Sequence, residues 1–431
     1  MKKIFKYILL ASLLTVLVCS CEKDEVDPNR RALVVMGFGF NNLSSYISED
    51  LGELESGFVP QSSGKDNLLF VMKHTTEGQY STKTAPVLYR LYKDKKGKVV
   101  KEEIFRLEEG ALSNSGECIG QILNYIKDHY QFKNCGVVLS SHGTGWTPPG
   151  YCSDPSKYEN ASSAGDVLKL GRSGKKISGG IVDYAPITEG PAVKSFGGTV
   201  TSPNGKEAYE TELREFAGGI PFKLDYIIFD ACFMGCVEVA YELKDKCRWF
   251  AASQTEIMAD GMNYRTMANY LLSGKSADLK GFCRSYYDYY EAKSGINRSA
   301  TISLIDCSRL EGLASVCKEV FSGLSISTET CNSDLLQRFY RSSYRRIHGW
   351  FYDLQSILEA AGADDAALAK VENELSKCVI YKAATEQFMN DFYVDCFSGF
   401  SMYLPYPERS YLNSYYKELA WNQATGLVRG E

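Results

Sequence analysis

The fold of this chain is decided by a helix-then-strand pattern at residues 116–145, which read GECIGQILNYIKDHYQFKNCGVVLSSHGTG. Apolar residues at 119, 122, 123 and 126 recur with the period of a helix, so a helix with one apolar face is predicted over 116–130. The apolar run at 135–140 follows closely and predicts a buried strand. Helices that alternate with strands cover a mainly parallel sheet, so we expect an α/β fold.

The same kind of analysis extends outward along the chain. Short apolar runs predict strands at 32–36, 68–72, 85–92, 225–231, 248–253, 301–305 and 398–405. A charged turn containing a glycine at 93–98 predicts a hairpin. Helical spacing predicts helices that open near Thr211 and at Cys232, and a largely helical region from about 325, at 335–346 and 351–362.

The composition excludes several classes of protein. With 431 residues, 44% of them hydrophobic and 23% charged, the chain is typical of a folded protein rather than a disordered one. A formal net charge of −5 argues against nucleic-acid binding, which normally needs a basic face. Fourteen cysteines and four histidines include no Cys-x-x-Cys pair, which argues against a zinc site. Most of these thiols are interpreted as small buried hydrophobic groups.

The N-terminus predicts export and lipidation. Residues 1–20 combine early lysines with an apolar stretch too short to span a bilayer, as a signal peptide does. Ser20 before Cys21 resembles a bacterial lipobox, so Cys21 is the predicted lipidated residue, and the acidic run after it resembles the export tag of surface lipoproteins. We expect a surface-exposed outer-membrane lipoprotein of the cell envelope, with 21–31 as a tether. The alternative is an ordinary secretory signal.

Two strand ends carry the candidate chemistry. His142 and Gly143 follow the predicted strand 135–140, and Cys232 follows the predicted strand 225–231. Parallel strands end at a common edge of the sheet, so His142 and Cys232 can meet there. An imidazole beside a thiol makes a nucleophilic pair, and a helix opening at Cys232 would favour the thiolate. The N–H groups of Gly143 and Cys232 could form an oxyanion hole.

An acidic residue stands two positions before the candidate nucleophile. Residues two apart on a strand point to the same side, so the Asp230 carboxylate is expected near Cys232, where it could attract a substrate Lys or Arg. The simpler alternatives are that Asp230 caps a helix, that His142 is a polar loop residue and that Cys232 is an inert buried thiol. Cys236 is its nearest competitor.

These residues together resemble the clostripain family of caspase-like cysteine peptidases. The resemblance rests on His-Gly-Thr-Gly at 142–145 and Asp-Ala-Cys at 230–232, each after a strand, and covers roughly 32–425. Supporting segments are Asn41-Asn42-Leu43 with Tyr46, Ala252-Ser253-Gln254-Thr255-Glu256 with Gly261 and Tyr264, Tyr352-Asp353-Leu354 and the run 398–405. One departure is Phe40, where the family usually has an acidic residue before Asn-Asn-Leu.

The resemblance implies a fold and an activity. The fold would be a caspase-like α/β/α sandwich over 32–325, followed by a C-terminal accessory region at 326–431. The activity would be cleavage of protein or peptide substrates after Arg or Lys. Matching residue by residue, His142 would be the general base, Cys232 the nucleophile and Asp230 the pocket for the basic side chain. Asp260 is a second pocket candidate.

The resemblance also suggests activation by internal cleavage. Residues 143–208 form a long Gly-, Ser- and Pro-rich insertion, which we expect to be exposed. Its basic residues are candidate processing sites, although a solvated loop is the simpler interpretation; they are Lys157, Lys169, Arg172, Lys175 and Lys176. No cofactor is expected. Some family members depend on calcium, but the chain has no EF-hand-like loop.

Two other functions stay open at this level. A lipid-anchored surface protein could bind peptide or glycan without catalysis. A His–Cys pair could also pass the acyl group to an amine instead of water.

Overall fold

The computed structural model describes residues 26–76, 84–152, 155–159, 200–202, 205–207, 210–342 and 349–429. The predicted signal segment and Cys21 lie outside these ranges, as do Lys169, Arg172, Lys175 and Lys176. Within them, no helix is both long and apolar enough to cross a bilayer.

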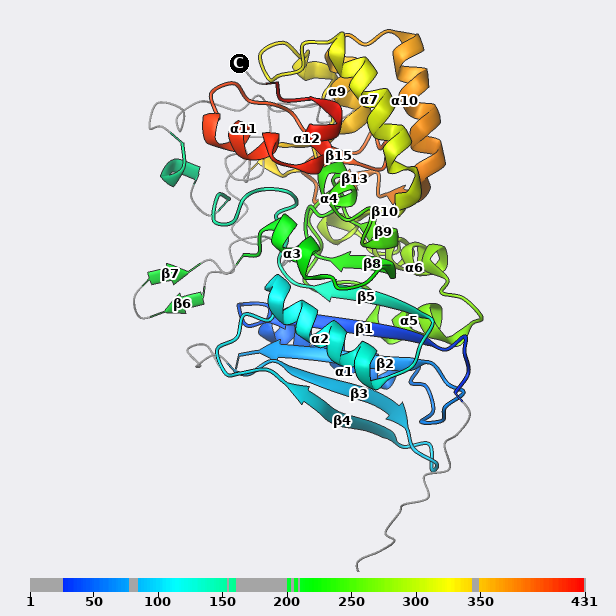
Figure 1. Cartoon of the computed structure of the whole chain (residues 1–431). Helices are drawn as coiled ribbons and strands as arrows, with labels where there is room; N and C mark the ends of the chain where they lie inside the picture. The colour runs from blue at the N-terminus through cyan, green and yellow to red at the C-terminus, as the bar shows by residue number, and fades with distance from the viewer. Residues whose placement is uncertain are drawn as a thin grey trace, which may run out of the picture.

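A central sheet organises the described part of the chain (Figure 1). Its order is β12-β10-β9-β8-β5-β1-β2-β3-β4. The strands are β1 (Arg31–Gly39), β2 (Leu68–Thr75), β3 (Val87–Lys93), β4 (Val99–Arg106), β5 (Asn134–Ser140), β8 (Leu224–Asp230), β9 (Cys247–Ala252), β10 (Thr301–Asp306) and β12 (Val379–Ala384). The run from β9 to β2 is parallel, and antiparallel strands flank it on both edges. The predicted mainly parallel α/β fold is confirmed at the centre of this sheet.

Helices pack on the sheet in two rows, which makes the three layers of an α/β/α sandwich (Figure 1). One row runs through mutual contacts from α2 (Gly116–His129) through α3 (Leu213–Gly219), α4 (Val237–Glu242), α12 (Ala420–Thr425) and α7 (Leu310–Ser322) to α10 (Asp365–Cys378). The other row joins α1 (Ser44–Ser56), α5 (Tyr264–Ala268), the π-helical turn Asn269–Ser273 and α6 (Leu279–Glu291). The helix predicted at 116–130 is confirmed, and Ser115 caps it by accepting from the Cys118 N–H.

The predicted boundary at 325/326 does not divide the sheet. Strand β12 comes from beyond it and pairs with β10 at the edge. A small sheet of β11 (Phe351–Asp353) and β15 (Ser401–Tyr403) lies beside the main one, and a bridge joins Cys236 to Ser401. One continuous hydrophobic core contains side chains from both regions, including Phe351 and Met402. The C-terminal region, which also holds α9 (Leu354–Ala360) and α11 (Ser410–Lys417), is therefore integral to the fold.

The helix predicted to open at Cys232 is wrong. Helix α4 begins only at Val237, with Cys236 as its N-cap. Cys232 lies in a turn, and Phe233 after it has a left-handed backbone with φ of 60°. The Phe233 N–H donates to the Thr255 carbonyl, which holds this turn against the segment after β9. Pairing with a segment distant in sequence therefore overrides the local helical spacing.

The helix predicted at 335–346 is also wrong over the residues described, 335–342. Only a short 3-10 turn, Ser333–Leu335, touches its start. Arg338 then forms an antiparallel bridge with Tyr352, so this segment is extended. The second predicted helix, 351–362, is confirmed only in part. Residues 351–353 form strand β11, and the helix α9 covers Leu354–Ala360.

Two other segments are more firmly held than the sequence suggests. The predicted tether ends before Arg31, whose guanidinium is buried and donates to the carbonyls of Leu271 and Leu272 at 2.6 and 2.9 Å. The predicted exposed insertion begins inside the core, because Trp146 and Tyr151 are fully buried. Strand β1 therefore begins inside the predicted tether.

Candidate active site

Strands β5 and β8 bring the two predicted loops to one edge of the sheet. Their register pairs Ser140 with Asp230, so the residues two positions later, His142 and Cys232, leave the sheet at the same level. Gly143 lies directly against the Cys232 backbone: a Cβ at Gly143 would come within 2.3 Å of the Cys232 carbonyl oxygen and 3.0 Å of its nitrogen. Only glycine permits this approach, which seats the two loops side by side.

The His142 ring is oriented by a residue from a third strand end. Its Nε2 lies 2.7 Å from Oδ1 of Asn42, which follows β1, the other neighbour of β5. Because an amide oxygen only accepts, Nε2 carries the proton and the lone pair of the neutral ring lies on Nδ1. Nothing in the sequence marked Asn42 as this partner, although Asn42 lies in one of the segments that support the family resemblance.

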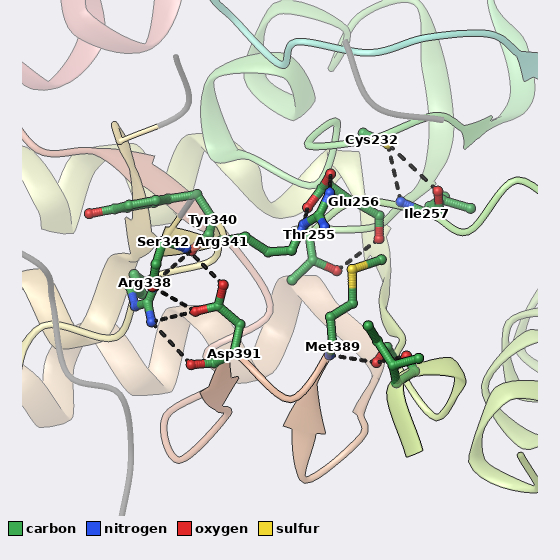
Figure 2. A network of polar contacts seen from close by, with 12 residues as sticks. Cys232, Thr255, Glu256, Ile257, Arg338, Tyr340, Arg341, Ser342, Met389 and Asp391 are labelled. Carbon is green, nitrogen blue, oxygen red and sulfur yellow. Dashed lines mark hydrogen bonds and ion pairs between the residues drawn. The ribbon is translucent and has the colours of Figure 1, made fainter. Parts of the chain in front are cut away.

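Cys232 is fully buried, and its sulfur contacts the backbone of Ile257 (Figure 2). The Ile257 N–H donates to Sγ at 3.1 Å, and the thiol reaches the carbonyl of the same residue at 3.8 Å. A donor N–H favours the thiolate, since it hydrogen-bonds the charged form. The left-handed Phe233 beside it stores strain of about 1–3 kcal/mol, as is common at functional sites.

Asp230 is fully buried beneath this turn. Its carboxylate accepts hydrogen bonds from the Tyr264 hydroxyl at 2.7 Å and from the Ser140 hydroxyl at 3.2 Å. Burial first, and then the nearby charge of Asp230, raise the pKa values of Tyr264 and Tyr286 well above their usual range. Both phenols therefore stay protonated at neutral pH and can act as donors.

A pocket of about 140 Å³ opens next to the segment that contacts the sulfur. It lies between the start of α1, the loop after β9 and the end of α6. Its lining residues are Tyr46, Met258, Ala259, Asp260, Tyr290, Lys293 and Asn297. Asp260 therefore lines a pocket, whereas Asp230 lies buried and is not among the lining residues.

Asp260 already has a cationic partner in this pocket. Lys293 Nζ lies 3.0 Å from its carboxylate and 4.2 Å from the centre of the Tyr289 ring. Burial lowers the pKa of Lys293, but the bonds to Tyr289 and Asp260 outweigh it, so the pKa is raised overall. Lys293 is therefore a resident ammonium at the acidic wall of the pocket.

The sequence profile of the clostripain family matches residues 35–166 and 204–426. The chain belongs to the clostripain family. It is accordingly a cysteine protease.

Solved structures agree with this clostripain-family assignment. The chain is similar over 93% of its length to an inactive zymogen C11 protease from Parabacteroides distasonis, with 24% identity, a TM-score of 0.69 and 99% of that chain covered. It is similar over the same share to a secreted C11 cysteine protease from Bacteroides thetaiotaomicron, with 26% identity, a TM-score of 0.68 and all of that chain covered. A complex of a secreted C11 protease from the same organism with an irreversible peptide inhibitor has 23% identity and a TM-score of 0.65, with 92% and 99% of the two chains covered. No curated protein matches the chain.

The competing cysteine of this clostripain-family chain is buried like Cys232 but has different neighbours. Cys236 is fully buried at the start of α4. Burial first, and then the charge of Glu238, raise its pKa well above the usual range, which keeps it a thiol. Its backbone forms a bridge with Ser401, which joins the start of α4 to β15.

Among the described residues, no group of three or more His, Cys, Asp or Glu side chains is arranged to hold a metal ion. Ile257 and Lys293 were not among the site residues predicted from the sequence. Ile257 contacts Cys232 through its backbone, and Lys293 lies far from both motifs along the chain.

Proposed function

We propose that this protease is an endopeptidase that cleaves after Arg or Lys through a His142–Cys232 dyad. The observation that carries the proposal is the contact between Gly143 and the Cys232 backbone, which places the two motif loops together. The equal heights of Ser140 and Asp230 in the sheet support the same pairing.

The dyad would work in two half-reactions. His142 first takes the proton of the Cys232 thiol. The thiolate attacks the substrate carbonyl carbon, and the N–H groups of Gly143 and Cys232 stabilise the oxyanion. His142, held by Asn42, passes a proton to the departing amine, which leaves a thioester on Cys232. Water then attacks the thioester with His142 as base, which releases the new carboxylate and restores the thiol.

Substrate selection would use the acidic groups around the pocket. Asp260 offers an accessible carboxylate to a basic side chain placed before the scissile bond. Asp230 adds a second negative charge beneath the turn and holds Ser140 and Tyr264 in place. A pocket lined also by Tyr46 and Tyr290 suits the long aliphatic stem of Arg or Lys.

A pair of cysteine variants tests the dyad. Cys232→Ala should abolish hydrolysis of short reporter peptides ending in Arg or Lys, while Cys236→Ala should keep most of it. Retained turnover in folded Cys232→Ala would overturn the proposal. For the pocket, Asp260→Asn should lose the preference for basic over neutral peptides, and Asp245→Asn, at an exposed surface pair, should not.

Activation by cleavage between the two motifs is part of the proposal. Of the candidate processing residues, Lys157 lies on an exposed 3-10 turn, Pro155–Lys157, and the others lie outside the described residues. One similar structure is an inactive zymogen, which suits this scheme. The intact mass of purified enzyme should show two chains split within 143–208. A single uncut chain with full activity would contradict processing.

Lipid anchoring at Cys21 completes the proposal and places the enzyme at the cell surface. Cys21→Ser should move the protein from the membrane fraction to the soluble fraction and remove labelling by a fatty-acid analogue. Unchanged labelling in this variant would exclude Cys21 as the lipidated residue.

A further inference from the structure

The segment 255–257 connects the sulfur of Cys232 to the C-terminal region (Figure 2). At one end, the Ile257 N–H donates to Sγ. At the other, the Thr255 N–H donates to the hydroxyl of Thr301 at 3.1 Å and its carbonyl accepts from Phe233. Glu256 stands between these contacts. Any movement of Glu256 would therefore move the N–H that faces the sulfur.

Glu256 is held by a buried ion pair. Two nitrogens of Arg341 donate to the two carboxylate oxygens at 2.6 and 2.8 Å, with side-chain exposures of 6% and 0%. Burial raises the pKa of Glu256 and the Arg341 charge opposes that rise. Without Arg341, the carboxylate would be a buried charge without its counterion, which must take up a proton or move toward water.

Arg341 is itself fixed from the C-terminal side. The next residue, Ser342, donates its N–H and its hydroxyl to Asp391 at 2.9 and 2.7 Å. Asp391 in turn forms a buried ion pair with Arg338 at 2.9 Å. Figure 2 shows these contacts as one network that ends at Cys232.

We propose that Arg341 is a positioning residue for the nucleophile: it locks Glu256, and thereby the Ile257 N–H, against the Cys232 sulfur. This inference rests on the proposed role of Cys232 as the nucleophile. The locked N–H stabilises the thiolate, because it donates a hydrogen bond to the charged sulfur. This bond is lost if the segment 255–257 moves. The C-terminal region thus contributes to catalysis through the backbone of Ile257.

Other titratable groups lie near Cys232 on the neighbouring elements. They are Asp230 on β8, Tyr286 on α6 and His142 on the loop after β5. Glu256 lies next to the contacting residue on its own segment. Replacing Arg341 leaves the first three groups in place, so a changed titration of the sulfur reports on the Ile257 contact and on the loss of the Arg341 charge.

A set of variants separates these two effects and guards against unfolding. Arg341→Met breaks the pair, while Glu256→Gln combined with Arg341→Met removes both charges and keeps a folded, neutral pair. Arg341→Lys keeps the charge but not the two-pronged geometry. Arg31→Met is the matched control. Arg31 is equally buried, but it donates to carbonyls at the start of β1, the end of the strand away from the candidate site.

The readout is the pH profile of Cys232 alkylation by iodoacetamide, followed by peptide mass spectrometry. In Arg341→Met and Arg341→Lys the thiolate fraction at neutral pH should fall about tenfold, with kcat reduced and KM nearly unchanged. Arg31→Met should keep the wild-type profile. An unchanged profile in folded Arg341→Lys and in the double variant would overturn the proposal. Alkylation does not need turnover, so this test stays independent of the proposed peptidase activity.

The Asp260–Lys293 pair carries a second, independent inference. Its side chains are 56% and 28% exposed, so it is worth little to stability and can exchange partners readily. A basic substrate side chain that enters the pocket meets a carboxylate whose charge is already balanced by Lys293. Binding therefore requires displacing or sharing that ammonium.

We infer that Lys293 makes the protease select Arg over Lys before the scissile bond, an inference that rests on the proposed basic specificity. A guanidinium can bind Asp260 with two parallel hydrogen bonds, which a resident ammonium cannot match. A substrate lysine offers only the same single charge that Lys293 already supplies. Competition therefore weakens binding of Lys substrates more than binding of Arg substrates.

Reporter peptides that differ only in Arg or Lys test this selection. In Lys293→Gln the KM for the Lys peptide should fall about fivefold and that for the Arg peptide less, which narrows the Arg-to-Lys ratio of kcat/KM. Lys370→Gln, at an exposed pair with Glu319, is the control and should change neither. An unchanged ratio in Lys293→Gln would overturn this inference alone. Failure of the wild type to cleave either peptide would overturn the proposed specificity and this inference with it.

Discussion

Two acid–base pairs lie on either side of Ile257, whose backbone contacts the Cys232 sulfur, and the pairs differ in burial. Glu256, just before Ile257, and its partner Arg341 are 0% and 6% exposed. Asp260, shortly after Ile257, and its partner Lys293 are 56% and 28% exposed. A buried pair keeps its geometry because losing one partner leaves a costly charge. An exposed pair exchanges partners easily. One short segment thus contacts the Cys232 sulfur at one end and lines the pocket at the other.

Stability measurements should show the largest difference between the two pairs. Arg341→Met should lower the free energy of unfolding by about 3–5 kcal/mol, because Glu256 is left buried with its counterion removed. Lys293→Met should lower it by less than about 1 kcal/mol. Urea denaturation of both variants measures this, and equal losses would contradict the contrast.

A third carboxylate, the fully buried one of Glu238, should make the free energy of unfolding depend on pH. Glu238 on α4 is fully buried and accepts from the Tyr403 N–H and the Tyr416 hydroxyl. Burial raises its pKa to about 7. The folded state therefore binds a proton that the unfolded state releases near its ordinary pKa, so this stabilisation is present at low pH and is lost as pH rises through about 7.

The test for this carboxylate is unfolding across pH 4–8. Relative to Glu238→Gln, the wild type should lose up to about 3 kcal/mol between the ordinary pKa of a Glu and the raised one. Asp260→Asn, on the exposed side, should leave the wild-type slope in place. Parallel curves for wild type and Glu238→Gln would exclude the raised pKa.

Orientation of His142 should have an intermediate effect, and only on turnover. Asn42→Ala removes the acceptor of Nε2, so kcat should fall about tenfold, or about 1.4 kcal/mol, with KM little changed. Asn41→Ala is the control within the same loop, because Asn41 caps the Leu43 N–H and not the ring. Equal losses in both variants would assign the effect to the loop rather than to the histidine.

Salt should produce the smallest effect, and only on the exposed side. Between about 0.05 and 0.5 M salt, KM for a basic peptide should rise about two- to threefold, because charges near the surface are screened. The thiolate fraction of Cys232, which depends on the buried pair, should stay constant over the same range. A salt-dependent alkylation rate would place the Glu256–Arg341 pair in contact with solvent.

Local patterns were enough to find the centre of the sheet and the two motif loops, but not the edge strand β12. Apolar runs at β1, β2, β5, β8 and β9 are dense, and the residues after β5 and β8 are polar at the point where parallel strands end. The contact of Gly143 with Cys232 follows from that topology. Such signals succeed because a buried strand is apolar whatever it pairs with.

The failures came from contacts between residues distant in sequence. Helical spacing after Cys232 and at 335–346 predicted helices, but the first segment pairs with Thr255 and the second bridges Tyr352. Helix propensity is a weak preference, and tertiary hydrogen bonds outweigh it. The same reason explains why the sequence showed no partner for His142.

The sequence by itself determined which residue types stand at the strand ends: an imidazole followed by a glycine after β5, and a carboxylate two residues before a thiol at the end of β8. Only the tertiary structure decided what surrounds them. Arg341 bonds Glu256 across 85 residues of sequence. Lys293, just after α6, bonds Asp260 in the loop after β9. Those pairings depend on how whole elements pack, and short-range periodicity carries no information about such distances.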